Sequence, residues 1–302
     1  MLDPHDLYSL DPNLPELTDP VLVSTLPGFV DAGSAGRLVT RHLLDSLPHR
    51  FLATFDADQL VDHRSHRPAM TFVEDHWDSY SPHLLAIHLL EDADGTQFLL
   101  LAGPEPDYQW KRFTSAVEQL IERFGVRLTI GTNAIPMTVP HTRPTGLTAH
   151  GSRKELVSEY EPWLSTVQVP GSVGALLEYR LGLAGRDAMG FAAHVPHYVA
   201  QAEYPAAAIA LLGAIERAAG LSLSADALAT VAEVTRVKID EQVERSSEVA
   251  SVVRALEEQY DSYTGPAGRS PMMALDGEAL PSADELGAEL EQFLAEQNRR
   301  DD

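Results

Sequence analysis

The segment VLVSTLPGFVDAGSAG, residues 21–36, decides the fold. Its first six residues form a β-branched apolar run typical of a buried strand, and the Pro-Gly pair at 27–28 ends that run. The loop at 28–33 then leads into a helix whose apolar residues recur every four positions, at Val39, Leu43 and Leu47. A buried strand joined to a helix by a glycine-containing loop is the repeating unit of α/β proteins.

The same alternation continues along the chain. Apolar, β-branched runs predict further strands at residues 51–55, 69–73, 84–90, 96–102, 126–130 and 188–194. Apolar residues at helical spacing predict helices at residues 107–124, 172–183 and 203–219. Strands alternating with helices of this length indicate a three-layer α/β/α sandwich in residues 1–219.

The pattern changes after Gly220, which divides the chain into a core domain, 1–219, and an acidic helical region, 220–302. Residues 223–260 read as one long helix or two stacked helices, with Ser246 and Ser247 as the expected break. A linker rich in glycine and proline, 264–281, separates them from a last helix that opens with the capping box SADE at 282–285. We expect proteases to cut this linker and leave a folded core.

Charge and composition exclude several classes of protein. The formal net charge is −23, which opposes binding to a nucleic acid or to an acidic membrane surface. The absence of cysteine removes disulfides, thiolate nucleophiles and cysteine-based metal or iron–sulfur sites. The first residues show no secretory signal and no stretch approaches 18 consecutive apolar residues, so we expect a soluble cytoplasmic protein. No cofactor motif is present.

The loop from Gly28 to Gly33 allows two interpretations. Backbone N–H groups at a helix start form an anion site, and glycines let a ligand approach closely. Asp31 would compete for those same donors, however, so a tight turn capped by Asp31 is the preferred interpretation and a ligand loop the alternative.

Two carboxylates, Glu105 and Asp107, follow a predicted strand at the carboxyl edge of the sheet, where α/β proteins bind ligands. Paired carboxylates can carry out acid–base chemistry. Acidic residues also stabilise a helix N-terminus without any further function, and we prefer that interpretation. Ser172, in the string GSVG, is explained better as a helix N-cap than as a nucleophile, because the Gly-x-Ser-x-Gly frame is missing.

The strings PHTRP (140–144) and HVPHY (194–198) carry the candidate residues His141, Arg143, His194 and His197. Two histidines three residues apart resemble a metal pair, but the proline at 196 makes a continuous helix between them improbable. We therefore expect no metal there. Histidines hydrogen-bonded to backbone or to an acid, lining a cleft or an interface, are the preferred interpretation.

Seven motifs occur in one order: GFVDAG (28–33), DADQL (56–60), RSHRP (64–68), GPEPD (103–107) with Trp110, PHTR (140–143), QVPGS (168–172) and HVPHY (194–198). Together they resemble the actinobacterial branch of the proteasome-assembly-chaperone-2 family, over about residues 20–262. The resemblance implies a mixed sheet between helices, similar to nucleoside phosphorylases and related hydrolases. It also implies an oligomer, and proteasome subunits as partners of some relatives. It supplies no catalytic residues.

Two function classes follow. The first is a non-catalytic interaction protein or assembly factor that self-associates, with a trimer expected. The second is a small-molecule binder or enzyme that uses a phosphorylase-like cleft, and a deep pocket joining Asp31, Glu105, His141 and His194 would favour it. Relatives that dock on proteasome rings often end in a hydrophobic–Tyr–any tripeptide, whereas this chain ends NRRDD at 298–302. We therefore expect no ring activation through this C-terminus.

Overall fold

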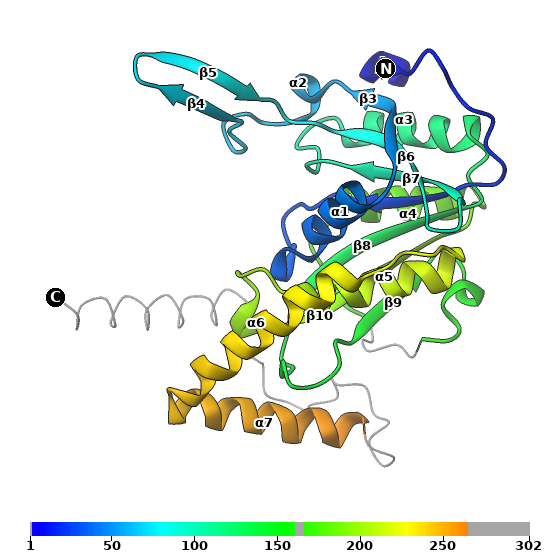
Figure 1. Cartoon of the computed structure of the whole chain (residues 1–302). Coiled ribbons are helices and arrows are strands. Elements are labelled where there is room, and N and C mark those ends of the chain that lie inside the picture. Colours follow the sequence, from blue (N-terminus) through cyan, green and yellow to red (C-terminus); the bar gives the residue numbers. More distant parts are fainter. Residues whose placement is uncertain (1, 161–165, 265–302) are drawn as a thin grey trace.

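The fold is a single mixed sheet of eight strands between two layers of helices, as a computed structural model of the chain shows (Figure 1). The structure describes residues 2–160 and 166–264. The strand order is β1-β3-β6-β7-β2-β8-β10-β9. In that order the strands span Tyr8–Leu10, His49–Phe55, Ala86–Glu91, Gln97–Ala102, Val21–Thr25, Leu128–Met137, Ala188–Pro196 and Leu147–Gly151.

The four central strands, β7, β2, β8 and β10, are mutually parallel, and the flanking pairs are antiparallel. All five residues of β2 and all nine of β10 are buried, because helices cover both faces of a parallel sheet. This burial explains why both strands read as continuous apolar runs in the sequence. The expected α/β/α sandwich with a mixed sheet is confirmed.

Two helices lie on each face of the sheet. Helices α1 (Ala35–Ser46) and α5 (Pro205–Ala219) share one core cluster with it, and α3 (Trp110–Arg123) and α4 (Val173–Leu183) share the other. The remaining short elements are α2 (Ala57–Leu60) and four 3-10 turns, η1 (Pro4–Leu7), η2 (Ala32–Ser34), η3 (Lys154–Val157) and η4 (His197–Val199). Each core is several tens of apolar side chains, so the fold needs no covalent cross-link.

A C-terminal pair of helices extends the outer layer. Helix α6 (Asp226–Glu244) packs on α5, and α7 (Ser247–Thr264) packs on α6. The break falls at Arg245 and Ser246, so the expected break at Ser246–Ser247 is confirmed. Leu228 and Ile239 of α6 belong to the same core cluster as α5. The expected linker and last helix, 264–281 and 282–298, lie outside the described residues apart from Thr264, which ends α7.

The apolar stripe of α7 is used largely within the chain. Val253 and Leu256 are buried, while Val249 and Val252 are exposed. The apolar side chains of α7 are therefore only partly available for contacts outside the chain. None of the helices in the described ranges is both long and apolar enough to cross a membrane.

The sequence of strand β4 (Ala69–Val73) suggests a strand of the main sheet, but β4 does not join that sheet. It pairs with β5 (His76–Ser81) in a separate two-stranded ribbon that projects from the body (Figure 1). The sequence pattern does not predict β1, β5 or β9, because none of these strands has the apolar run of a buried strand. The helix expected from Asp107 begins only at Trp110, after a loop.

Candidate functional site

The carboxyl ends of the parallel strands bring most of the predicted residues to one edge of the sheet. The loops after β2, β7, β8 and β10 carry eight of the nine residues, and His194 lies within β10 itself. Such an edge is the usual ligand site of an α/β sheet. Whether it is one here depends on what each side chain contacts.

Asp31 is tied to the start of α1. Its Oδ1 accepts a hydrogen bond from the Gly36 N–H at 2.7 Å, and its Oδ2 accepts a longer one from the Arg37 N–H at 3.3 Å. The carboxylate therefore occupies the helix N-terminal donors that a phosphate would need. Gly33 has a φ of +65°, which favours glycine, and exchanges backbone hydrogen bonds with Ala200 and Tyr204. Asp31 therefore closes the turn on the first residues of α1.

Glu105 links two loops beneath the sheet edge. Its Oε1 accepts a hydrogen bond from the Val173 N–H, at the start of α4, at 2.6 Å, and the Phe29 N–H also donates to the carboxylate. A side chain at Gly28 would overlap this carboxylate, so the glycine is needed for the close approach. Burial raises the pKa of Glu105 above its ordinary value, although the two backbone donors oppose that shift.

Asp107 holds the segment that leads into the ribbon. Its Oδ2 accepts a hydrogen bond from the Asp62 N–H at 2.6 Å, and its Oδ1 lies 3.6 Å from the His66 imidazole. The Asp107 and Tyr108 N–H groups both donate to the carbonyl of Leu60. Glu105 and Asp107 therefore anchor different segments and do not act as a facing pair of carboxylates.

His141 lies in a hydrogen-bonded row between two helical elements. Its Nδ1 is 2.7 Å from the Tyr198 hydroxyl, which also accepts the His141 N–H, and its Nε2 is 3.0 Å from Oδ1 of Asp240 on α6. Because the Asp240 carboxylate can only accept, the tautomer that satisfies both contacts carries its proton on Nε2 and accepts the Tyr198 hydroxyl proton at Nδ1. Burial raises the pKa of Tyr198 to about 12, so that proton stays on the hydroxyl.

Arg143 is held by carboxylates of α7. Its guanidinium donates to both oxygens of Asp261, at 2.8 and 2.7 Å, and to Glu257 at 3.3 Å. The Thr142 hydroxyl donates to the same Glu257, and the Tyr260 hydroxyl donates to the carbonyl of Pro144. The loop from 140 to 144 is therefore clamped by α7.

The two histidines of the HVPHY string lie in different environments. His194 is buried within β10, where its Nε2 lies 2.8 Å from the Thr148 hydroxyl and its N–H donates to the carbonyl of Gly146. His197 opens the turn η4 at the surface. Within residues 2–160 and 166–264, no three side chains of the metal-ligating kinds lie close enough to hold a metal ion.

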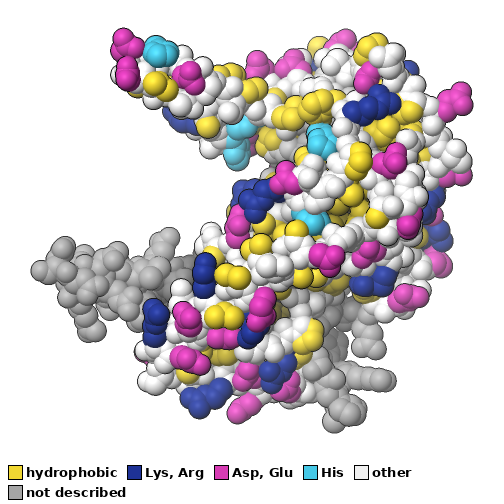
Figure 2. Space-filling view, in the orientation of Figure 1, with side chains coloured by type: hydrophobic (Ala, Val, Ile, Leu, Met, Phe, Trp, Pro, Cys, Tyr) yellow, Lys and Arg dark blue, Asp and Glu magenta, His cyan; other side chains and the backbone are white. Residues whose placement is uncertain are grey.

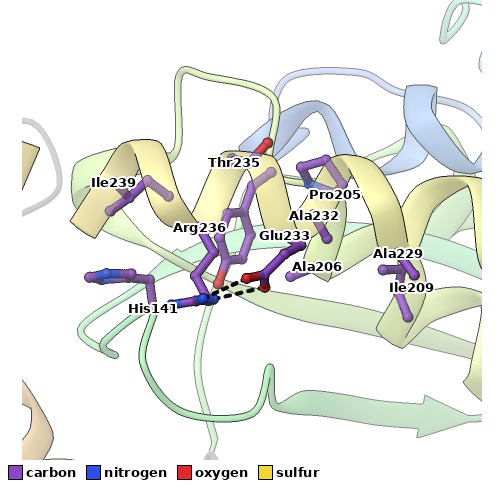
Figure 3. Close-up of a pocket in the computed structure, with 11 residues that line it drawn as sticks. His141, Pro205, Ala206, Ile209, Ala229, Ala232, Glu233, Thr235, Arg236 and Ile239 are labelled. Atoms are coloured by element: carbon purple, nitrogen blue, oxygen red, sulfur yellow. Dashed lines mark hydrogen bonds and ion pairs between the residues drawn. The ribbon is translucent and has the colours of Figure 1, made fainter. Parts of the chain in front are cut away.

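One cavity, of about 220 Å³, opens between α5 and α6. Figure 3 shows His141 and Ile239 at one end, Ile209 and Ala229 at the other, and the Glu233–Arg236 ion pair between them. Of the nine predicted residues, all of which are described, only His141 lines this cavity. This cavity therefore does not join His141 to Asp31, Glu105 and His194.

The sequence alone could not identify the hydrogen-bonding partners of most of the predicted residues. Tyr198, Asp240, Glu257 and Asp261 lie 57 to 118 residues away from the loop that they hold. Asp31 and Ser172 are exceptions, because local signals predicted that they cap helices. Ser172 caps α4 by accepting a hydrogen bond from the Ala175 N–H at 3.1 Å, as expected.

These features define a class: a three-layer α/β protein whose carboxyl-edge loops are held by their own polar side chains. The chain belongs to the PAC2 family, whose model matches residues 25–243. The family resemblance of the sequence is thereby confirmed. No curated protein matches the chain.

Solved structures support the same assignment. A Mycobacterium tuberculosis protein of unknown function, Rv2714, is 49% identical, with a TM-score of 0.82 over 85% of this chain and 89% of that one. A Corynebacterium glutamicum protein of unknown function is 42% identical, with a TM-score of 0.81 over 85% and 97%. The M. tuberculosis proteasome-assembly chaperone homologue Rv2125 is 24% identical, with a TM-score of 0.71 over 77% and 99%, and shares the fold.

Proposed function

We propose that this protein is a non-catalytic interaction protein that self-associates and acts as an assembly factor on proteasome subunits. One observation carries the proposal: the charged groups at the sheet edge hold loops and helices of the chain itself, as Asp31, Glu105 and Arg143 illustrate. An enzyme of this fold would instead point several of them into a shared pocket.

The surface adds support for a binding role. Large apolar side chains are exposed on several elements, including Trp77 on the ribbon and Tyr179 and Leu183 on α4. Helix α4 carries apolar residues on more than one side: Val173, Leu177 and Leu181 are buried, whereas Tyr179 and Leu183 are exposed. Exposed apolar patches mark protein–protein contacts more often than chance.

The proteasome is proposed as a partner because of a relative with the same fold. Rv2125, which shares this fold, is described as a proteasome-assembly chaperone homologue, and we extend that description to this chain as a proposal. In this proposal the α/β body, which exposes large apolar side chains, contacts unassembled subunits. A cytoplasmic location fits such a partner.

Native mass spectrometry tests the proposal directly. Purified α-type 20S subunits from the same source are mixed with the full chain before and after ring assembly. We expect a complex with the unassembled subunits and none with the assembled particle. Absence of a complex with the unassembled subunits at micromolar concentrations would contradict the proposed partner. The same spectra give the oligomeric state of the chain alone, which we expect to be a trimer.

A second candidate function is small-molecule binding, favoured by the cavity between α5 and α6. Its walls are mainly apolar, from alanine and isoleucine side chains, and His141 and Arg236 supply polar groups at one end. A compact apolar ligand with one polar end would fit these walls. Ile209→Trp should fill the cavity, so ligands that raise the melting temperature of the wild type but not of this variant would support this alternative.

A further inference from the structure

Helix α4 exposes a row of apolar side chains along its outer side. Ala175, Tyr179 and Leu183 are spaced by four residues, so they line up along one side of the helix, and all three are exposed. The solvent-exposed fraction is 66% for Tyr179 and 73% for Leu183. The inner side of α4 packs on β8, β10 and α3. We call Ala175, Tyr179 and Leu183 the outer row, and its two large side chains are mostly open to solvent.

Charged groups flank the outer row but do not interrupt it. On one flank, the Glu178 carboxylate lies 2.9 Å from Nδ1 of His150 on β9. On the other flank, the Arg180 guanidinium donates to both oxygens of Glu118 on α3, at 2.6 and 2.8 Å, and to the carbonyl of Lys111. Two cations and two carboxylates therefore balance around the row, although the chain as a whole has a formal net charge of −23. This balance lets a second copy approach the row without local repulsion.

The opposite side of the molecule has a different character. Figure 2 shows that side, formed by α1, α5 and α6, with acidic and basic side chains scattered between apolar ones. On α6, for example, the exposed Val231 and Val234 share their side of the helix with the exposed Lys238 and Glu241. A continuous apolar row with balanced flanks therefore distinguishes α4 from α6 as a contact surface.

The outer row is complementary to itself when two α4 helices lie antiparallel. Ala175 and Leu183 lie four residues on either side of Tyr179, about 6 Å along the helix axis. In an antiparallel pair centred near Tyr179, Leu183 of one copy is therefore level with Ala175 of the other, so a large side chain meets a small one at both ends. A parallel pair would bring the two leucines together at one end and leave the alanines apart at the other.

The residues beside the outer row fit the same arrangement. Leu176 lies on the α3 side of the row and Gly182 on the β9 side, each four residues from the flanking charge of that side. A two-fold axis perpendicular to both helices brings like sides together. Leu176 then meets Leu183 of the other copy on the α3 side, and Gly182 meets Ala175 on the β9 side. The small pair permits a close approach, and the leucine pair fills the space opposite.

We propose that two copies of this chain pair through the outer rows of their α4 helices, antiparallel and related by a two-fold axis beside Tyr179. The same surface is used on both copies, as a two-fold contact requires. The inference rests on the proposed self-association and extends it, because a two-fold contact alone cannot build the expected trimer. Three-fold and two-fold contacts together close into a hexamer of two trimers.

The expected contact is small. An exposed tyrosine and an exposed leucine, with smaller side chains beside them, bury roughly 400 Å² per copy and on the order of 800 Å² per pair, which is the size of a weak interface. A hexamer forms three such contacts at once, so the effective concentration raises its affinity well above that of one pair.

Substitutions at Tyr179 test the two-fold axis, because a residue beside such an axis meets its own copy. Tyr179→Lys and Tyr179→Glu are prepared as full-length variants, and sedimentation equilibrium measures the association of each alone and of their mixture. We expect each variant alone to associate at least tenfold more weakly than the wild type, since like charges meet at the axis. Mixing the two should restore the affinity to within about threefold of the wild type, because opposite charges then meet.

Val231→Lys and Val231→Glu are the matched controls. Val231 is exposed on α6, so these variants change the net charge by the same amounts at a position outside α4. Their association, alone or mixed, should equal that of the wild type. All four variants alter exposed positions, so circular dichroism should show an unchanged fold.

Cysteine cross-linking tests the antiparallel direction, since the natural chain has no cysteine. Ala175→Cys and Leu183→Cys are prepared as separate full-length variants and mixed under mild oxidation. We expect disulfide-linked dimers in the mixture and few in either variant alone, because two copies of the same residue are about 12 Å apart along the helix axis. A parallel pair would cross-link each variant alone and leave the mixture without mixed dimers.

The outcomes separate this inference from the proposed function. Tyr179 variants that associate as the wild type does, single cysteine variants that cross-link as readily as the mixture, or a wild type that is only a trimer at 100 micromolar would overturn the α4 pairing and leave self-association intact. A wild-type monomer at that concentration would overturn both. Tyr179→Glu that keeps self-association but no longer binds proteasome subunits would also overturn the pairing, and would assign the outer row to that partner.

Discussion

At the scale of single residues, buried imidazoles distinguish this protein. His194 and His88 lie within the central sheet, each almost fully buried. Burial lowers the pKa of each to about 4, and for His88 the neighbouring His49 adds to that effect. Both imidazoles are therefore neutral in the folded chain throughout the physiological range, so His194 serves the fold as a hydrogen-bonding group.

The first prediction concerns the pH dependence of stability. The imidazole pKa is about 6.5 in the unfolded chain, so between pH 6.5 and 4 the unfolded chain binds a proton that folded His194 does not. The free energy of unfolding should therefore decrease as the pH is lowered from 6.5 to 4, by up to about 3 kcal/mol from His194. In His194→Gln that part of the slope should vanish in urea titrations, whereas the exposed control His76→Gln should keep it. Equal slopes in the wild type and His194→Gln would contradict the burial of a neutral imidazole.

Sequence reasoning succeeded at residues whose partners are close in sequence. Asp31 and Ser172 cap helices that begin within a few residues, so local patterns predicted both roles. Glu105 and Asp107 were predicted at the carboxyl edge of the sheet, but their partners lie far away in the sequence. No spacing rule could have paired His141 with Asp240, because the contact exists only after α6 packs on α5.

At the scale of secondary-structure elements, the existence of α7 was predictable but its position was not. Its apolar spacing predicted a helix, and the break before it was expected. Besides the buried Val253 and Leu256, polar contacts between Arg143 and the carboxylates of Asp261 and Glu257 hold it in place. The ribbon posed a similar problem, since the bulge at Asp78 disguises the alternation of β5. Buried strands such as β2 and β10 were predictable because burial on both faces leaves a continuous apolar run.

The second prediction concerns the clamp between α7 and the loop at 140–144. Arg143→Ala should raise amide hydrogen exchange along 247–264 several-fold and leave the exchange of β2 and β10 unchanged. Because the ion pair is exposed to solvent, the loss of global stability should be modest. Arg153→Ala, which removes a comparable bidentate pair with Asp187 just before the first residue of β10, is the control and should leave α7 unaffected. Unchanged exchange in α7 would show that apolar packing alone holds the helix.

At the scale of the whole molecule, the chain combines an α/β body with two elements that expose apolar side chains, the ribbon and α4. The body uses its polar groups to join loops to helices. The net charge of −23 favours partners with basic surfaces and predicts that their binding weakens as salt is raised. The parallel sheet made the body predictable from sequence, whereas the surfaces depend on which faces remain uncovered after folding.

The rate of proteasome assembly is the most direct test of the proposal that this protein is an assembly factor. Separate α-type and β-type 20S subunits from the same source are mixed with and without the full chain, and peptide hydrolysis is followed over time. The account predicts that active particles form faster with the protein present, while preassembled particles hydrolyse the peptide at an unchanged rate. Identical time courses of assembly with and without the protein, or stimulation of preassembled particles that disappears on removing residues 298–302, would contradict it.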